Sequence, residues 1–180
     1  AFVMCLASCA ESYNIQGSSS VSSLDGSKLY LKAVKNKKVE NIDSCDVVHG
    51  KFHFIGTLDT TRIVNLFMDE RSLMMPIVLE KGDIIVKIDD SSQRVCGTPL
   101  NEKLYCFLER HNQLSNRMNE LSHRESQMLL DGIDENEIAA QLSVEAEQIA
   151  MEEDTLVTNF IILNSDNVLD ISKLQGIARS

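Results

Sequence analysis

Apolar and polar residues alternate in short runs over the first half of the chain. In residues 51–56, for example, Phe52 and Phe54 fall on one face, which is the period of a half-buried strand. Such runs recur about every ten residues, and turn signals containing glycine separate them. The expected strands are residues 13–16, 28–34, 39–48, 51–56, 62–68, 73–80, 84–88 and 93–97. Their number and spacing predict an antiparallel β-sandwich or barrel of seven to eight strands.

One of these expected strands carries a proline. Pro76 lies inside the apolar run 73–80. Because proline cannot donate a hydrogen bond to a neighbouring strand, we expect this strand at the edge of a sheet or at a bulge.

The spacing of apolar residues changes to a helical period after Gly97. Thr98 can cap a helix, and Pro99 suits its first position, where the missing N–H costs nothing. The next apolar positions follow in steps of four and three, which is a heptad seam with polar interruptions at His111 and Glu125. The seam positions are Leu100, Leu104, Phe107, His111, Leu114, Met118, Leu121, Glu125 and Met128.

A second helix is predicted after the break at Asp131 and Gly132. Asp134 followed by Glu137 is typical of a capping box. The apolar stripe then runs to about residue 164 through Ile138, Leu142, Ala146, Ile149, Leu156, Phe160 and Leu163. Two long helices joined by a short turn predict an antiparallel hairpin. The expected fold class is therefore α+β, with the sandwich or barrel followed by this hairpin.

The pattern divides the chain into four parts. We interpret residues 1–9 as the remnant of a lipoprotein signal that ends in a lipidated cysteine, and residues 10–98 as the antiparallel β domain. Residues 99–164 are expected to form the hairpin, packed on or beside the β domain. Residues 165–180 are a tail, which can also be the start of a linker to a missing domain.

Negative charge is concentrated in the second half of the chain. The formal net charge is -10, and between Glu125 and Lys173 there are twelve acidic residues and no Lys or Arg. Nucleic-acid binding requires clustered cations that face phosphates, so we expect no nucleic-acid partner. The acidic residues of the second helix are interpreted as its solvated face, since they lack the loop spacing of a calcium site.

The N-terminus resembles the end of a bacterial lipoprotein signal. An apolar run is followed by Leu6, the small residues Ala7 and Ser8, and then Cys9. Small residues allow peptidase access, and the thiol of Cys9 is then the group that carries the lipid. The alternative is a short apolar strand that happens to contain cysteines. The lipoprotein interpretation places the protein in the bacterial cell envelope, anchored to a membrane through Cys9 and facing the periplasm or the cell surface.

Three further cysteines remain in the body of the chain: Cys45, Cys96 and Cys106. They contain no Cys-x-x-Cys pair, so they do not match a thioredoxin-type redox motif or a zinc ribbon. Cys96 and Cys106 can be joined by a disulfide in an oxidising compartment, but small buried apolar residues are the favoured interpretation for these cysteines.

No motif of catalysis is recognised in the sequence. The four histidines, His49, His53, His111 and His123, lack the spacing of a metal site. His111 lies on the helical seam, where a hydrogen-bonded core histidine is more common than a metal ligand. We therefore assign no catalytic residue, no cofactor and no metal to these 180 residues.

A set of spaced glycines, aromatic and polar residues resembles a known bacterial pattern. The pattern consists of Tyr13-x-Ile15-x-Gly17, Leu24-Asp25-Gly26-x-x-x-Tyr30-Leu31, Ile42-Asp43-Ser44, Gly50-x-Phe52-x-Phe54-x-Gly56, Leu79-Glu80-x-Gly82 and Gly97-Thr98-x-Leu100-Asn101. It is similar to the β-rich N-terminal domain of unknown function of bacterial lipoproteins that carry a C-terminal thioredoxin-like (AhpC/TSA, thiol-disulfide oxidoreductase) domain. The resemblance covers residue 11 to about residue 164.

The resemblance implies an accessory module beside a redox domain, and it supplies no catalytic residues for this module. Two functions follow as expectations. The first is a non-catalytic, lipid-anchored binding module of unknown ligand, with a thioredoxin-like partner in cis or in trans. The second is a fragment of a periplasmic thiol-disulfide oxidoreductase whose catalytic domain is absent from this chain. The helical seam also allows a homodimer through the helices.

Overall fold

The structure is a computed structural model that describes residues 11–35, 38–69 and 72–170 of the 180-residue chain. Cys9 and the rest of the expected lipoprotein signal lie outside the described residues. The chain forms two compact units that divide between Tyr105 and Cys106. Each unit is described by itself below.

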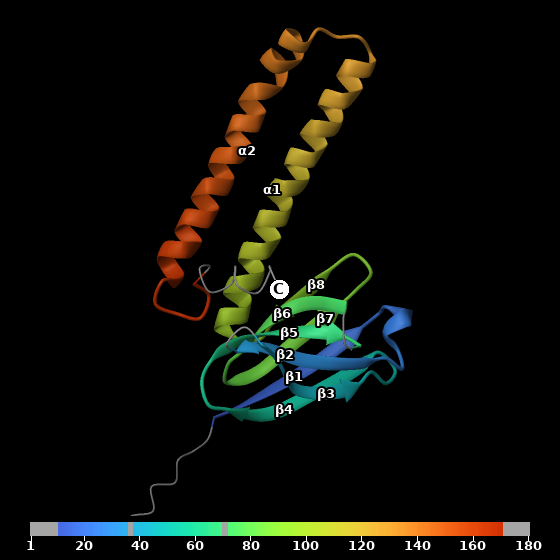
Figure 1. The fold of residues 1–180 in the computed structure, drawn as a ribbon, viewed down its shortest axis with the longest axis vertical. Coiled ribbons are helices and arrows are strands. Elements are labelled where there is room, and N and C mark those ends of the chain that lie inside the picture. Colours follow the sequence, from blue (N-terminus) through green and yellow to red (C-terminus); the bar gives the residue numbers. More distant parts are fainter. Residues whose placement is uncertain (1–10, 36–37, 70–71, 171–180) are drawn as a thin grey trace, which may run out of the picture. The chain divides into compact units, whose positions relative to one another are not determined.

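The first unit contains two four-stranded sheets (Figure 1). Its strands are β1 (Glu11–Ser19), β2 (Lys28–Lys35), β3 (Lys38–Asp46), β4 (Lys51–Leu58), β5 (Arg62–Met68), β6 (Ser72–Leu79), β7 (Gly82–Ile88) and β8 (Gln93–Cys96). One sheet has the strand order β4-β1-β7-β8 and the other has the order β3-β2-β5-β6. The sequence predicts a sandwich or barrel of seven to eight strands, and the structure has eight strands in two sheets, so the α+β class is confirmed.

One strand pair departs from the antiparallel prediction. β1 and β7 pair in parallel, with Tyr13 opposite Gly82 and Ser19 opposite Ile88. Parallel neighbours need a long crossover connection. Here the connection includes all four strands of the other sheet, which lie between β1 and β7 in the sequence. Apolar alternation reports which face of a strand is buried but not the direction of its neighbour, so the sequence pattern could not indicate this pair.

Glycines and aromatic rings face each other across β1 and β4. Gly56 pairs with Tyr13, and Gly17 pairs with Phe52. A Cβ built at Gly17 would overlap the Phe52 ring, and one built at Gly56 would overlap the Tyr13 ring. Each ring therefore covers the backbone of a glycine on the neighbouring strand, which is a known way to stabilise glycine in a sheet. Between these two pairs, Ile15 lies opposite Phe54 in the core.

The strand that carries Pro76 is an edge strand, as predicted, because β6 ends its sheet. Its outward backbone groups are satisfied by side chains from the first turns of helix α1 (Pro99–Leu130). Asn101 Oδ1 accepts a hydrogen bond from the Val78 N–H at 2.9 Å, and Asn101 Nδ2 donates to the Val78 carbonyl at 2.8 Å. The Tyr105 hydroxyl donates to the Pro76 carbonyl at 2.8 Å. The Asn101 amide therefore bonds to Val78 as a neighbouring strand would.

Glu80, one residue beyond β6, caps the start of α1. Glu80 Oε1 accepts hydrogen bonds from the backbone N–H groups of Leu100 at 2.8 Å and Asn101 at 3.0 Å. A carboxylate at this end is favoured because the first N–H groups of a helix lack partners within the helix. The sequence predicts Thr98 for this role. Instead, Thr98 Oγ1 accepts a hydrogen bond from the Asn101 side chain at 2.8 Å, so it supports the group that binds β6.

The second unit is the helical hairpin that the sequence predicts. The main part of α1 runs antiparallel to α2 (Glu135–Asn164) (Figure 1). Asp134 caps α2 by accepting a hydrogen bond from the Asn136 N–H at 2.9 Å. Gly132 has a positive φ of 77° at the end of α1, as a helix-terminating glycine requires. The predicted break between the helices is therefore confirmed.

A buried apolar seam joins the two helices. Its core consists of Leu114, Leu121, Ile138, Leu142 and Ile149. The predicted stripe is wrong at its end, because Leu163 is exposed. The buried position there is Asn164, four residues after Phe160, and its Nδ2 donates to the Phe160 carbonyl at 2.7 Å. Neither helix, within the residues that the structure describes, has a run long and apolar enough to span a membrane.

Replacing Asn101 should test the bond between the helix and the sheet edge. In Asn101→Ala the N–H and carbonyl of Val78 lose their partners while they stay buried, which costs about 2–4 kcal/mol. We expect the free energy of unfolding, measured by urea denaturation, to fall by about that amount. The control is Asn112→Ala, because Asn112 is an exposed asparagine further along α1. Equal stability of the two variants would contradict this assignment.

Candidate functional site

The histidines of the chain are not gathered into one site. His49 and His123 are exposed, and His49 has a positive φ of 50° in the turn before β4. His111 Nε2 lies 3.1 Å from Glu153 Oε1 of α2, so this seam histidine has a partner, but its side chain is 40% exposed and it is not the core residue that the sequence predicts. Among the residues that the structure describes, no group of three or more His, Cys, Asp and Glu side chains is placed to hold a metal ion.

A hydrogen-bonded chain crosses one exposed sheet face. His53 Nε2 on β4 contacts Asn14 Oδ1 on β1, and Asn14 Nδ2 donates to Asp83 Oδ1 on β7 at 2.7 Å. His53 and Asp83 are exposed and Asn14 is partly exposed, so water competes with each bond. Asn14 separates the imidazole from the carboxylate, and the chain therefore ties three neighbouring strands together rather than forming a direct His–Asp acid–base pair.

The cysteines in the described part of the chain are free thiols. Cys45 and Cys96 are partly buried, whereas Cys106 is exposed, so the interpretation of Cys96 and Cys106 as buried apolar residues is wrong for Cys106. Burial raises the pKa of the Cys45 thiol to about 11, and the negative charges of Asp43 and Asp46 act in the same direction. A thiol with this pKa is protonated at neutral pH and is a poor nucleophile.

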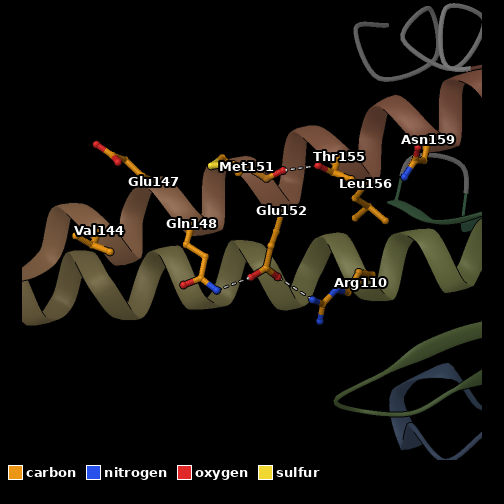
Figure 2. Close-up of a pocket in the computed structure, with 9 residues that line it drawn as sticks. All are labelled: Arg110, Val144, Glu147, Gln148, Met151, Glu152, Thr155, Leu156 and Asn159. Carbon is orange, nitrogen blue, oxygen red and sulfur yellow. Dashed lines mark hydrogen bonds and ion pairs between the residues drawn. The ribbon is translucent and has the colours of Figure 1, made fainter.

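The second unit has an open groove along α2, of about 690 Å³. Its lining residues are Arg110, Val144, Glu147, Gln148, Met151, Glu152, Thr155, Leu156 and Asn159. Arg110 comes from α1 and the others from α2. Figure 2 shows Gln148 and Glu152 pointing toward α1, whereas Glu147 points away from it. The accessible lining is largely apolar, because Val144 and Met151 are exposed.

Ion pairs along the hairpin hold one side of this groove. Arg110 and Arg117 both contact Glu152 Oε2, at 2.9 and 3.0 Å. Seven residues after Arg117, Arg124 contacts Glu145 Oε2 at 2.8 Å. The three arginines are seven residues apart on α1 and so lie on one side of the helix. Each exposed pair stabilises the hairpin only slightly, but the series favours one register of α1 against α2.

Two acidic side chains beside the groove are not part of these pairs. Glu147 and Asp154 are seven residues apart on α2 and therefore project from the same side of the helix. Both are exposed, and neither forms an ion pair with another described residue. The groove thus combines an apolar stripe with a negative rim.

Sequence reasoning missed this groove, although a signal for it was present. Val144, Met151 and Ile162 follow each other at helical spacing, offset from the seam positions. The seam stripe already accounts for the helical period of α2, so no role was predicted for the positions of the second stripe. Whether these side chains are exposed depends on how the two helices pack, which the periodicity of the sequence alone does not reveal.

The comparison with known families concerns the first unit. The pattern of the domain of unknown function DUF4369 matches residues 13–104, just over half of the chain. The match begins on β1 and ends on the first turns of α1, so it is shorter than the resemblance expected from the sequence, which reached about residue 164, and the hairpin beyond Leu104 lies outside it. Among curated proteins none matches this chain. The chain belongs to the DUF4369 family.

Proposed function

We propose that this protein is a non-catalytic binding module that presents the groove of its helical hairpin to a partner and is held at a membrane by a lipid on Cys9. The groove carries this proposal. It offers exposed apolar side chains and uncompensated negative charge on an element that its own ion pairs and buried seam hold in one register. Exposed apolar surface with a polar rim is typical of binding sites.

The roles of the family-pattern residues support a structural first unit. Gly17 and Gly56 make room for aromatic rings, while Glu80 and Asn101 fasten α1 to β6. These side chains are engaged in packing and in hydrogen bonds within the fold. A scaffold that presents another surface accounts for such a pattern without a reaction.

Membrane attachment rests on the sequence around Cys9. In this proposal a peptidase cleaves after Ser8 and Cys9 becomes the acylated first residue of the mature chain. A single acyl chain binds a membrane only marginally, so durable anchoring takes more than one. The proposed location is the bacterial cell envelope, facing the periplasm or the cell surface, where a thioredoxin-like domain in cis or in trans is the proposed neighbour.

A second candidate is the accessory part of a thiol-disulfide oxidoreductase. The sequence resemblance to lipoproteins that carry a thioredoxin-like domain favours it. The coding sequence beyond Ser180 tests this second candidate: a downstream thioredoxin-like segment with a Cys-x-x-Cys pair supports it, and a stop codon or an unrelated segment contradicts it.

Substitution of Cys9 tests the proposed anchor. We expect Cys9→Ala, expressed from the complete gene, to move from the membrane fraction to the soluble fraction, because the residue that carries the lipid is gone. The matched control is Cys106→Ala, which removes an exposed thiol elsewhere and should remain with the membranes. If Cys9→Ala still sediments with membranes, or if the mature protein retains residues 2–8 without a lipid, the proposed anchor is wrong.

An insulin reduction assay tests the non-catalytic assignment. With dithiothreitol as reductant, the chain should not accelerate insulin precipitation beyond a variant in which Cys45, Cys96 and Cys106 are replaced by Ser. The physical reason is that these thiols include no Cys-x-x-Cys pair and that the raised pKa of Cys45 keeps it protonated. Circular dichroism confirms that the variant is folded. A faster reaction with the native chain would contradict the assignment.

A further inference from the structure

The outer stripe of α2 is a second apolar face on a helix that already buries one. Val144, Met151 and Ile162 are 72%, 70% and 66% exposed. The seam residues Ile138, Leu142 and Ile149 are buried on the side of the helix that packs against α1. A surface helix normally carries one apolar stripe and a polar remainder. The additional stripe therefore indicates a face that another element covers.

The stripe has the dimensions of a helix-binding site. Val144, Gln148, Met151, Thr155 and Ile162 follow the i, i+4, i+7, i+11 and i+18 spacing of one helical face. From Val144 to Ile162 the helix advances by 18 steps, which span about 27 Å at 1.5 Å per residue. A partner helix of about 18 residues matches this length and would insert its own apolar side chains at i, i+3, i+4 and i+7.

The charge of α2 distinguishes between partners. The helix contains no Lys or Arg, and its acidic residues are Glu135, Glu137, Glu145, Glu147, Glu152, Glu153 and Asp154. The arginines of α1 in the described hairpin already contact Glu145 and Glu152. Glu147 and Asp154, which lie along one side of the outer stripe, remain for a cation that comes from outside.

A second copy of this chain fits the stripe poorly. Two α2 helices packed face to face and antiparallel would bring Glu147 and Asp154 of one copy close to the same acidic residues of the other. Like charges in a desolvated interface cost several kcal/mol. A helix with Lys or Arg beside an apolar stripe would place opposite charges at these positions, and its association would be steered electrostatically.

We propose that the groove along α2 binds a cationic amphipathic helix of another protein. The proposal rests on the binding-module function above and specifies its partner by chemistry. Apolar side chains of the partner contact Val144 and Met151, and its Lys or Arg side chains face Glu147 and Asp154. The charges select this partner over others, and the apolar stripe provides most of the contact area.

Designed peptides provide the test. Three helical peptides of about 20 residues share one apolar stripe and carry Lys, Gln or Glu at the flanking positions. A fourth, scrambled peptide has the composition of the Lys peptide, but its residues are ordered so that the helix has no apolar face. Binding to the full chain is measured by fluorescence anisotropy at low and at physiological salt. We expect the Lys peptide to bind at least roughly tenfold more tightly than the Gln and scrambled peptides and to weaken with salt, and the Glu peptide not to bind.

Two variants of α2 localise the contact. Met151→Ser removes apolar contact without changing charge and should weaken binding of the Lys peptide by roughly tenfold or more. Leu163→Ser is the matched control, since Leu163 is 72% exposed on the same helix but lies on another side of it. Glu147→Gln should weaken binding several-fold at low salt and have a smaller effect at high salt.

The contradicting outcomes separate the two proposals. If the Lys and Gln peptides bind equally and Met151→Ser abolishes both, the partner is not selected by charge, and the binding groove itself still stands. If the scrambled peptide binds as well as the amphipathic one, or if no peptide binds, the proposed partner is wrong. Sedimentation that shows a dimer of the native chain and a monomer of Met151→Ser would assign the groove to a second copy instead.

Discussion

The free edge of β6 is the constraint on which the remaining structure depends. An edge strand presents unpaired N–H and carbonyl groups, and proteins must cover or blunt such edges. Here Pro76 has no N–H to donate, and its carbonyl accepts a hydrogen bond from the Tyr105 hydroxyl. The N–H and the carbonyl of Val78 are both hydrogen-bonded to the Asn101 side chain. Burial raises the pKa of Tyr105, so its hydroxyl stays protonated and continues to donate. Glu80 completes the arrangement because it fixes the residue at which α1 begins.

The family pattern is explained by this constraint and by close packing. Glu80, Thr98 and Asn101 belong to one hydrogen-bonded cluster, although they are separated in the sequence. Gly17 and Gly56 are required because rings lie over them. Residues with such roles specify a scaffold, so a binding surface is to be sought elsewhere in the chain. The hairpin beyond Leu104 lies outside the family match and carries the groove with its negative rim.

Local patterns predicted the elements well and the connections between them less well. The strands and both helices follow from periods of two and of seven residues, and Pro76 indicated an edge. The parallel pairing of β1 with β7, the capping of α1 by Glu80 and the burial of Asn164 in place of Leu163 depend on residues distant in the sequence or on the geometry of the folded hairpin. The groove was missed for a related reason, since one helix carries two stripes and the seam explained the more hydrophobic one.

The arrangement at the β6 edge can be measured directly by amide hydrogen exchange of the native chain. The N–H groups of Val78, Leu100 and Asn101 are bonded to side chains rather than to a regular ladder or helix. If these bonds hold α1 on the sheet edge, the three amides should exchange only through global unfolding, as slowly as the amide of Val86 in the centre of its sheet. Exchange as fast as that of Asp90, in the exposed turn after β7, would contradict the account.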